Sequence, residues 1–401
     1  MIKQVYEYVI VGGGLAGASA IDGIRELDKV GKILMICAEK HLPYDRPPLS
    51  KKLWLGKQKV ESIFLHGQTF YDQHKVTLLQ GVKAERLDPS QRTITTSNGE
   101  SYGFGKLLLA TGCMARRLTI PGSNLEGICY FRSLSDYLHT RSVAAAGKSA
   151  VVVGGGFIGS ELAAALSINK LNVTMIFPDA TLCSRVFPDS LARAMLRNFQ
   201  ERGINVLTSD KPDSFSRNGD KFITHTESGK TIESDLVIVG VGVTPETDLA
   251  KSGSLQVGNG IVVNEYLETS DPAIYAAGDN ALFPHHALGQ QMRLEHWDNS
   301  LSQGKWAGRN MAGAHKSFTY QPYFFSDLFE FGYEATGEVD SRLDTFADWQ
   351  KENDTGVIYY LRNGKVRGVM LCNVWDKIEA ARALIKNGET VVPEMLRDLI
   401  R

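Results

Sequence analysis

Two glycine-rich runs in the chain have the spacing that brings a peptide backbone against the pyrophosphate of a dinucleotide. The runs read VIVGGGLAGASA from residue 9 and VVVGGGFIGSEL from residue 151. The shared pattern G-x-G-x-x-G permits a tight turn, a close approach of the phosphates and close packing of a helix on a strand. Its glycines are Gly12, Gly14 and Gly17 in the first run and Gly154, Gly156 and Gly159 in the second. A single run could be a turn without a ligand, but two copies predict two dinucleotide sites.

An acidic residue follows the first run at the distance expected for a ribose contact. Glu39 comes 22 positions after Gly17, at the end of the apolar segment 33–37. A carboxylate there accepts hydrogen bonds from both ribose hydroxyls and repels a 2′-phosphate. The first site is therefore predicted to hold an unphosphorylated adenosine, as in FAD. The alternative for Glu39 is an exposed acid at a strand end.

The second run departs from this rule. Asp179 comes 20 positions after Gly159, behind an apolar residue and a proline, and Arg185 follows six residues later. Asp179 can contact a ribose, whereas Arg185 can stack on adenine or hold a 2′-phosphate. The pattern favours NADH over NADPH and leaves NADPH open.

The elements that position these residues repeat along the chain. Each run begins as an apolar, β-branched strand and continues through the glycine turn into a helix, whose first N–H groups are free to bind phosphate. Strands that alternate with helices indicate an α/β fold with parallel sheets. The sequence thus predicts two Rossmann-like domains.

Composition restricts the class of protein. The chain has 401 residues, a formal net charge of −1, 43% hydrophobic residues and 22% charged residues. This length suits two or three domains, and the balanced charge argues against a nucleic-acid partner. The five cysteines show no metal-ligand spacing, so no metal is predicted and a reducing, cytoplasmic location is expected. The longest stretch with little polar character, about residues 8–21, is too short to span a membrane.

Further segments resemble a known family. They are PYDRPPLSK (43–51), LLLATG (107–112), VGVTP (241–245), IYAAGD (274–279) and EHWDNSLSQGKWAGRNM (295–311). Together they resemble flavoprotein reductases with two dinucleotide folds, especially NADH-dependent ferredoxin and rubredoxin reductases and apoptosis-inducing factor. The stretches FFSDLFEFGYEATGEVDS (324–341) and YYLRNGKVRGVMLCN (359–373) resemble the apoptosis-inducing-factor branch.

This resemblance implies an architecture. An FAD domain, residues 1–113 and 247–319, is interrupted by an NAD(P)H domain, residues 114–246. A C-terminal α/β domain, residues 320–401, follows and ends with a helix near residues 377–387.

The resemblance also implies the residues beside the flavin. Lys51 reaches the flavin N5 region, and Glu161 pairs with it and contacts the nicotinamide amide, which makes this pair the predicted catalytic site. Taken alone, Glu161 lies on the first turn of its helix and could simply complement the helix dipole. Arg46 reaches the pyrophosphate, and Asp279 accepts a hydrogen bond from the ribityl chain, although it could also be an ordinary helix cap.

A second group implied by the resemblance surrounds the flavin edge. Glu295, His296 and Trp297 begin a helix whose N-terminal amides stabilise negative charge on the reduced ring. Phe325 packs on the flavin where relatives carry Trp, and Arg132 contacts FAD or makes a surface salt bridge. Outside this context His296 would be a structural histidine and Trp297 a core residue. The remaining predicted cofactor contacts are Leu15, Ala16, Lys40, Val82, Ala110, Thr111, Gly112, Phe157, Ile158, Gly242 and Gly278.

The reaction class depends on a missing cysteine. Related disulfide reductases carry a redox cysteine pair after the ribose acid, whereas this chain reads RPPLSKKLW at residues 46–54. Cys37 falls in a predicted buried strand and is expected to pack as a small apolar residue. We therefore expect hydride transfer from NADH to FAD, with electrons leaving the flavin directly.

Three functions remain open. The first is electron transfer to a small iron–sulfur carrier, a ferredoxin or rubredoxin, by a monomer or homodimer. An acidic carrier needs a basic surface; Arg293, Lys305 and Arg309 flank the EHW motif, and the alternative is that these cations are simply solvated. The second is a redox-gated interaction protein that resembles apoptosis-inducing factor and forms a long-lived NADH charge-transfer complex. The third is a diaphorase that reduces quinones or oxygen.

Overall fold

The structure is a computed structural model that describes residues 2–400. The chain forms two compact units, and each is described by itself. Unit 1 contains residues 1–45, 61–114 and 245–324, and unit 2 contains residues 46–60, 115–244 and 325–401. Both units are built on a parallel sheet, which confirms the predicted α/β class. The chain crosses between the units at residues 45–46, 60–61, 114–115, 244–245 and 324–325.

Unit 1 is organised around a sheet with strand order β3-β2-β1-β6-β5-β4, in which β19 also pairs with β6. Its strands are β1 (Ile2–Val11), β2 (Ile33–Cys37), β3 (Val76–Gln80), β4 (Ala84–Asp88), β5 (Thr93–Thr96), β6 (Ser101–Leu109) and β19 (Ile274–Ala276). Strands β1, β2, β3, β6 and β19 pair in parallel, whereas β4 and β5 add an antiparallel hairpin. The carboxyl ends of β1 and β2 therefore lie at the same edge as the first glycine turn.

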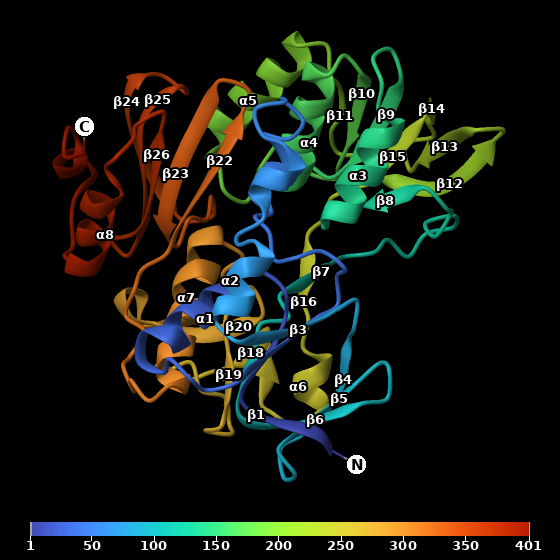
Figure 1. The fold of residues 1–401 in the computed structure, drawn as a ribbon. Helices are drawn as coiled ribbons and strands as arrows, with labels where there is room; N and C mark the ends of the chain where they lie inside the picture. The colour runs from blue at the N-terminus through green and yellow to red at the C-terminus, as the bar shows by residue number, and fades with distance from the viewer. Residues whose placement is uncertain (1, 401) are drawn as a thin grey trace. The chain divides into compact units, whose positions relative to one another are not determined.

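Two helices cover this sheet. They are α1 (Leu15–Leu27) and α7 (Trp297–Met311), which lie side by side in Figure 1. Their contact is unusually close, because a Cβ atom added at Gly304 or Gly308 would lie 2.2 Å from the carbonyl oxygen of Ala16 or Ala20. Glycines on α7 thus let the two backbones touch. The smaller elements of unit 1 are α2 (Gln68–Gln73), α6 (Asp248–Ser252), β17 (Val257–Gly258), β18 (Gly260–Val262), β20 (Ala281–His285) and β21 (Gln290–Met292).

Unit 2 repeats the pattern. Its parallel sheet has the order β11-β10-β9-β15-β8, and the second glycine turn joins β9 to α4. The elements are β8 (Ile128–Tyr130), α3 (Leu134–Val143), β9 (Ser149–Val153), α4 (Phe157–Ile168), β10 (Asn172–Ile176), α5 (Asp189–Glu201), β11 (Asn205–Leu207) and β15 (Leu236–Val239). A three-stranded antiparallel sheet precedes β15: β12 (Pro212–Asn218), β13 (Lys221–Thr226) and β14 (Thr231–Ser234). The short strands β7 (Cys113–Ala115) and β16 (Val243–Pro245) lie where the chain crosses between the units.

The C-terminal part of unit 2 is a five-stranded sheet of order β22-β23-β26-β25-β24 (Figure 1). Its elements are β22 (Tyr323–Leu328), β23 (Phe331–Gly337), β24 (Asp344–Lys351), β25 (Thr355–Arg362), β26 (Lys365–Cys372) and α8 (Ile378–Asn387). Helix α8 packs on β23 and β26, in agreement with the helix expected near residues 377–387. Residues 46–60, which the sequence places in the FAD domain, group with this unit, and the three-domain division stays a prediction.

None of the helices described between residues 2 and 400 combines the length and the apolar composition that crossing a membrane requires. Within the same residues, no group of three His, Cys, Asp or Glu side chains is arranged to hold a metal ion.

Candidate functional site

The two glycine turns are alike, but the three glycine positions within each turn differ in why glycine is needed. A Cβ atom at Gly12 would lie 2.0 Å from the carbonyl oxygen of Ala110, and one at Gly154 would lie 2.3 Å from that of Gly240. The third glycines, Gly17 and Gly159, are equally restricted by the carbonyl oxygen of the first glycine, 2.1 Å away in both turns. Protein packing alone therefore explains why these positions need glycine.

The second glycine of each turn is different. Apart from its own chain neighbours, a Cβ atom at Gly14 or Gly156 would have no atom of residues 2–400 within 4 Å. Both residues cap the N-terminus of a helix without a side-chain hydrogen bond, so no side-chain cap satisfies the first N–H groups of α1 and α4. The open space at both turns fits the pyrophosphate groups of two dinucleotides.

Glu39, the predicted ribose contact of the first site, lies just after the end of β2. The residue is half-buried, and Oε2 of its carboxylate accepts a hydrogen bond of 2.6 Å from the Tyr44 hydroxyl. Lys40 and Val82 flank the same sheet edge, where the N–H of Val82 donates to the carbonyl of Cys37 over 3.0 Å. Tyr44 was missed by sequence reasoning, because a tyrosine five residues from an acid has no distinctive pattern.

The predicted ribityl contact sits at the end of β19. Gly278 has a φ of 88°, and its N–H donates to Oε1 of Gln303 on α7 over 2.9 Å. Oδ1 of Asp279 accepts a hydrogen bond of 3.1 Å from the Ser300 hydroxyl, also on α7. Helix α7 therefore fixes the loop that carries Asp279. The LLLATG segment lies beside it, since Asn280 donates to the Thr111 hydroxyl over 2.9 Å.

The EHW motif begins α7 as predicted, with His296 as the N-cap. Trp297 donates its indole N–H to Oδ1 of Asp45 over 2.7 Å, and the His296 ring stacks on Phe324 at a centroid distance of 4.4 Å. Nδ1 of His296 is buried and forms no hydrogen bond within residues 2–400. Burial lowers the pKa of His296 to about 4, so the ring is neutral at pH 7. An unpaired, neutral imidazole fits a site that receives a ligand.

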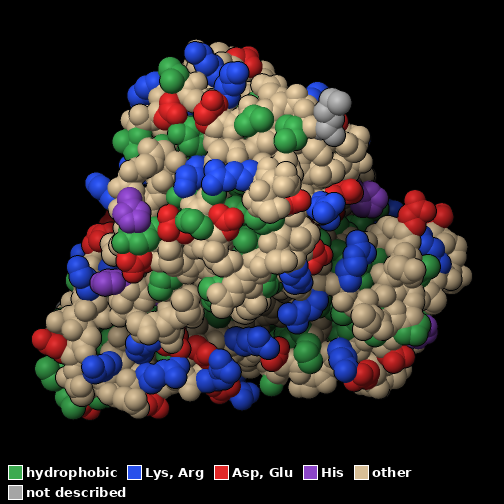
Figure 2. Space-filling model, turned by 90° about the horizontal axis from the view of Figure 1, so that it is seen from below, with side chains coloured by type: hydrophobic (Ala, Val, Ile, Leu, Met, Phe, Trp, Pro, Cys, Tyr) green, Lys and Arg blue, Asp and Glu red, His purple; other side chains and the backbone are tan. Residues whose placement is uncertain are grey.

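The cations beside this motif do not form a free basic surface. Arg293 pairs with Glu295 at 2.8 Å, while Lys305 and Arg309 both pair with Glu26. These two cations lower the pKa of Glu26 to about 2. The molecular face drawn in Figure 2 shows basic and acidic side chains interspersed. The expectation that these three cations could together attract an acidic carrier is therefore weakened.

Lys51 and Glu161, the predicted catalytic pair, lie together in unit 2. Lys51 Nζ is 3.5 Å from Oε1 of Glu161, and the two side chains are 11% and 7% exposed. The ammonium group also lies 4.8 Å from the centroid of the Phe325 ring. The sequence placed Glu161 on the first turn of its helix. Because helix α4 begins at Phe157, Glu161 instead lies in the second turn. A role as a helix-dipole acid is therefore excluded, because that effect falls off within the first turn.

Two serines complete this cluster, and sequence reasoning missed both. Ser50 donates to Oε2 of Glu161 over 2.5 Å, and Ser326 donates to Oε1. Lys51 Nζ makes no hydrogen bond to any residue in the described part of the chain. A mostly buried ammonium whose N–H groups are not directed at a protein acceptor fits an acceptor atom supplied by a bound cofactor.

The other predicted site residues of unit 2 lie in several separate segments of the chain. Arg46 donates to the carbonyl of Arg132 over 2.8 Å, so these two lie together. Gly242 has a φ of 93° and open space around its Cβ position. Asp179 and Arg185 are exposed after β10, and the carbonyl of Arg185 accepts the N–H of Ser341 over 2.9 Å. Their nucleotide contacts stay predictions.

Most of the five cysteines lie in surroundings that disfavour thiol chemistry. All five are buried and none is bonded to another. Burial raises the pKa of Cys37, Cys129 and Cys183 to about 12, which keeps these thiols protonated and unreactive at neutral pH.

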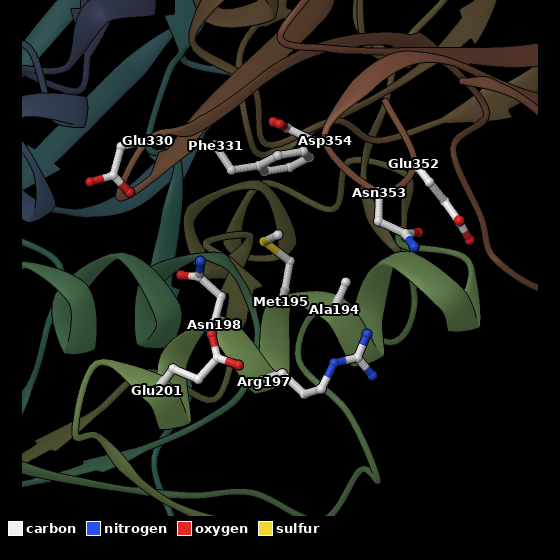
Figure 3. A pocket seen from close by; sticks show the side chains of 10 residues that line it. All are labelled: Ala194, Met195, Arg197, Asn198, Glu201, Glu330, Phe331, Glu352, Asn353 and Asp354. Carbon is white, nitrogen blue, oxygen red and sulfur yellow. The ribbon is translucent and has the colours of Figure 1, made fainter. Parts of the chain in front are cut away.

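A pocket of about 390 Å³ lies elsewhere in unit 2, between α5 and two turns of the C-terminal sheet. Figure 3 shows Met195 of α5 pointing towards Phe331, with Glu201, Glu330 and Glu352 around them. None of the predicted site residues lines it. The pocket is therefore separate from the predicted cofactor contacts.

Comparisons with known proteins agree with this geometry. Residues 6–304 match the family described as pyridine nucleotide-disulphide oxidoreductase. Residues 307–355 and 347–387 match the C-terminal domain of mitochondrion-associated apoptosis-inducing factor.

The relatives include both apoptosis-inducing factors and rubredoxin reductases. Mitochondrial apoptosis-inducing factor 1 of Dictyostelium discoideum is 34% identical over 97% of this chain and 80% of its own length. Rubredoxin-NAD(+) reductase of Pseudomonas putida is 36% identical over 80% of this chain and 83% of its own length.

Solved structures show the same fold. The putidaredoxin reductase–putidaredoxin complex matches with a TM-score of 0.91 and 29% identity, covering 99% of this chain and 96% of that chain. A ferredoxin reductase of Rhodopseudomonas palustris matches with a TM-score of 0.91 and 28% identity, covering 98% of both chains. The chain therefore belongs to the pyridine nucleotide-disulphide oxidoreductase family and is an NAD(P)H-dependent flavoprotein reductase.

Proposed function

We propose that this chain passes electrons from NADH through FAD to a small iron–sulfur protein of the ferredoxin or rubredoxin type, in the cytoplasm. The observation that carries this proposal is the cluster of Lys51, Glu161, Ser50 and Ser326, together with the burial of all five cysteines and the absence of a disulfide among them. A reductase without a thiol relay delivers electrons from its flavin to the acceptor. The relatives named as rubredoxin and ferredoxin reductases support an iron–sulfur acceptor.

FAD, when bound, supplies the step between two-electron hydride chemistry and one-electron release. The residues of unit 1 would hold it: the open turn at Gly14, the acid Glu39 for the ribose and Asp279 for the ribityl chain. Because His296 is neutral at pH 7, the backbone N–H groups at the start of α7, and not the imidazole, would stabilise negative charge on the reduced ring.

The residues of unit 2 would bind the nicotinamide nucleotide. The open turn at Gly156 suits its pyrophosphate, and Asp179 suits the ribose of NADH better than a 2′-phosphate. Lys51 supplies a fixed positive charge with unused N–H donors, and Glu161 balances that charge. None of these side chains has to move a proton of its own, because hydride transfer needs no general acid or base from the protein.

Cytochrome c reduction tests the acceptor. Purified protein with NADH is assayed alone and then with a ferredoxin or a rubredoxin added at micromolar concentration. We expect reduction of cytochrome c to become fast only when the iron–sulfur protein is present. Equal rates with and without it, together with fast turnover of a quinone or of oxygen, would show a diaphorase instead.

A second function is favoured by one observation, the match of the C-terminal region to apoptosis-inducing factor. In that case NADH would react slowly and leave a stable long-wavelength absorption band, and the reduced protein would change its association state. Anaerobic sedimentation of the protein with and without NADH distinguishes this function from electron transfer to a carrier. The redox-gated function requires that the mass of the sedimenting species changes when NADH is added.

A further inference from the structure

The carboxylate of Glu161 is held more completely than an ion pair with Lys51 would require. The residue is 7% exposed, and each of its two oxygens accepts a serine hydroxyl: Oε1 from Ser326 and Oε2 from Ser50. Both serines are themselves only 2% exposed. Donors on both oxygens fix the plane of the carboxylate, because rotation about its last bond would break both hydrogen bonds.

Lys51 does not hold the carboxylate in the same way. Its Nζ lies 3.5 Å from Oε1, whereas hydrogen bonds between ammonium and carboxylate groups are usually about 2.7–2.9 Å. The ammonium group is attracted by the charge of Glu161 and by the face of Phe325, at 4.8 Å, but donates to neither in a defined direction. The direction of the carboxylate is therefore set by the serines, and the direction of the ammonium N–H groups is left open.

The two serines reach Glu161 from distant parts of the chain. Ser50 ends the short 3-10 helix Pro47–Ser50, directly before Lys51, and Ser326 lies in β22 beside Phe325. The separations in sequence are 111 and 165 residues. Strand β22 therefore contributes both the ring that faces Lys51 and the hydroxyl that holds its counter-ion.

We propose that Ser50 and Ser326 are positioning residues for the reductase reaction. Their hydroxyls fix the Glu161 carboxylate, so that the Lys51 ammonium is held by charge alone and keeps its N–H donors for the bound cofactor. This inference rests on the proposed function, in which Lys51 and Glu161 act beside the flavin and the nicotinamide.

The test is a double-mutant cycle on the full-length holoprotein. Wild type, S326A, E161Q and S326A/E161Q are mixed anaerobically with saturating NADH, and the rate constant of flavin bleaching is recorded. Loss of a charge-assisted hydrogen bond is expected to slow bleaching about tenfold in S326A, with a smaller change in the NADH concentration for half-maximal rate. In the E161Q background, S326A should change the rate less than about twofold, because the charge that the serine fixes is already gone.

Two further variants separate positioning from packing. Ser326→Thr keeps the hydroxyl and should restore the rate, and Ser50→Ala should repeat the loss seen in S326A. Ser142→Ala is the matched control, since its hydroxyl donates only to the carbonyl of His139 on α3. A wild-type rate in S326A, or the same fold-loss with and without E161Q, overturns the assignment.

Melting temperatures of the same proteins give a readout that does not depend on turnover. S326A should lower the melting temperature more in the wild-type background than in E161Q, where the acceptor is neutral. Equal shifts in both backgrounds overturn the coupling between Ser326 and Glu161. If wild-type protein is reduced by neither NADH nor NADPH, the proposed function fails, and the melting temperatures still decide whether the two residues act together.

Discussion

Lys51 is a mostly buried cation whose Nζ lies 3.5 Å from one carboxylate and forms no hydrogen bond within the described part of the chain. Taking an ammonium group out of water is costly unless its donors are satisfied, so such an arrangement is unusual for a purely structural lysine. The energetic cost is explained if a bound cofactor supplies the missing acceptor. Glu161 then has two functions: it balances the charge of Lys51 and keeps that charge in place.

Replacing either member of the pair should affect chemistry more than binding of FAD. We expect Lys51→Ala and Glu161→Ala to slow flavin bleaching by NADH about tenfold to a hundredfold, as when one charge-assisted hydrogen bond of about 1.5–3 kcal/mol is lost. FAD content should stay near that of wild type, because neither residue is predicted to contact the adenosine. Stopped-flow absorbance and the ratio of flavin to protein measure the two quantities. Wild-type kinetics in both variants would refute the role of the pair.

Alanine substitutions at two glycines of the second turn should separate an effect on stability from an effect on NADH binding. Gly156→Ala places a methyl group where no protein atom lies within 4 Å, and should cost less than about 1 kcal/mol of stability. It should nevertheless raise the Kd for NADH, because the methyl group occupies the space open to the pyrophosphate. Gly154→Ala is the matched variant: its Cβ would lie 2.3 Å from a carbonyl oxygen at a φ of 124°, which should cost about 1–3 kcal/mol.

Melting temperatures and NADH titrations of the two variants check this comparison. If Gly156→Ala bound NADH as tightly as wild type, the open space at that turn would not be a pyrophosphate site.

His296 makes stability depend on pH. Burial lowers the pKa of its ring from 6.5 to about 4, so the unfolded chain binds the proton more readily between these values. Stability supplied by the neutral ring is complete above pH 6.5 and is lost as the pH falls towards 4. Because the ring is partly exposed, we expect this loss to be about 1–3 kcal/mol.

Thermal unfolding from pH 7.5 to 4 compares wild type with His296→Phe, which keeps an aromatic ring to stack on Phe324. The wild-type protein should lose more stability than the variant over this window. Parallel curves would show that His296 does not titrate as a buried group.

At the residue scale, sequence patterns predicted the groups that have a fixed spacing. The glycines and Glu39 stand at intervals that a strand, a turn and a helix impose, and a short motif identified Lys51. Ser50, Ser326 and Tyr44 were not predicted, because a hydroxyl that donates across 111 or 165 residues leaves no local pattern.

At the scale of elements, the contact between α1 and α7 positions much of unit 1. Glycines at 304 and 308 bring α7 against the backbone of α1, and α7 also carries Gln303 and Ser300, which hold the Gly278–Asp279 loop. The spacing of the two helices therefore sets the position of the predicted ribityl contact.

Enlarging one of these glycines should show the coupling. In Gly308→Ala the added Cβ would lie 2.2 Å from the carbonyl oxygen of Ala20, so the helices must separate, at a cost of about 1–3 kcal/mol. We expect a lower melting temperature and faster loss of FAD on dilution. Gly67→Ala serves as control, since its Cβ would have no atom within 4 Å. Equal behaviour of the two variants would contradict the close packing of α1 and α7.

The strands and helices themselves were largely predictable. Segment 33–37 forms β2, and the helix expected at 377–387 is α8, because apolar runs and helical periodicity are local signals. The prediction that Glu161 lies in the first helical turn was wrong: α4 begins directly after Gly156, so Glu161 lies in the second turn. Helix starts are difficult to place where a glycine, and not a side-chain cap, precedes the first turn.

At the scale of the whole molecule, the repeat in the sequence predicted two parallel sheets and the structure contains both. The grouping of residues 46–60 with unit 2 was not predicted, because the contacts of Ser50 and Lys51 with Glu161 are long-range. Membership of the family establishes a flavoprotein reductase, while the electron acceptor depends on a surface that no motif in the chain identifies.

The central claim is that this protein takes a hydride from NADH rapidly and gives the electrons to an iron–sulfur carrier. The most direct measurement is anaerobic stopped-flow mixing with NADH and, separately, with NADPH, followed by a pulse of oxidised ferredoxin or rubredoxin. We predict fast bleaching of the flavin by NADH, slower bleaching by NADPH, and fast recovery of the flavin absorbance when the carrier is added. Slow bleaching that leaves a coloured complex, stable to both air and the carrier, would contradict this account and favour a redox-gated interaction protein.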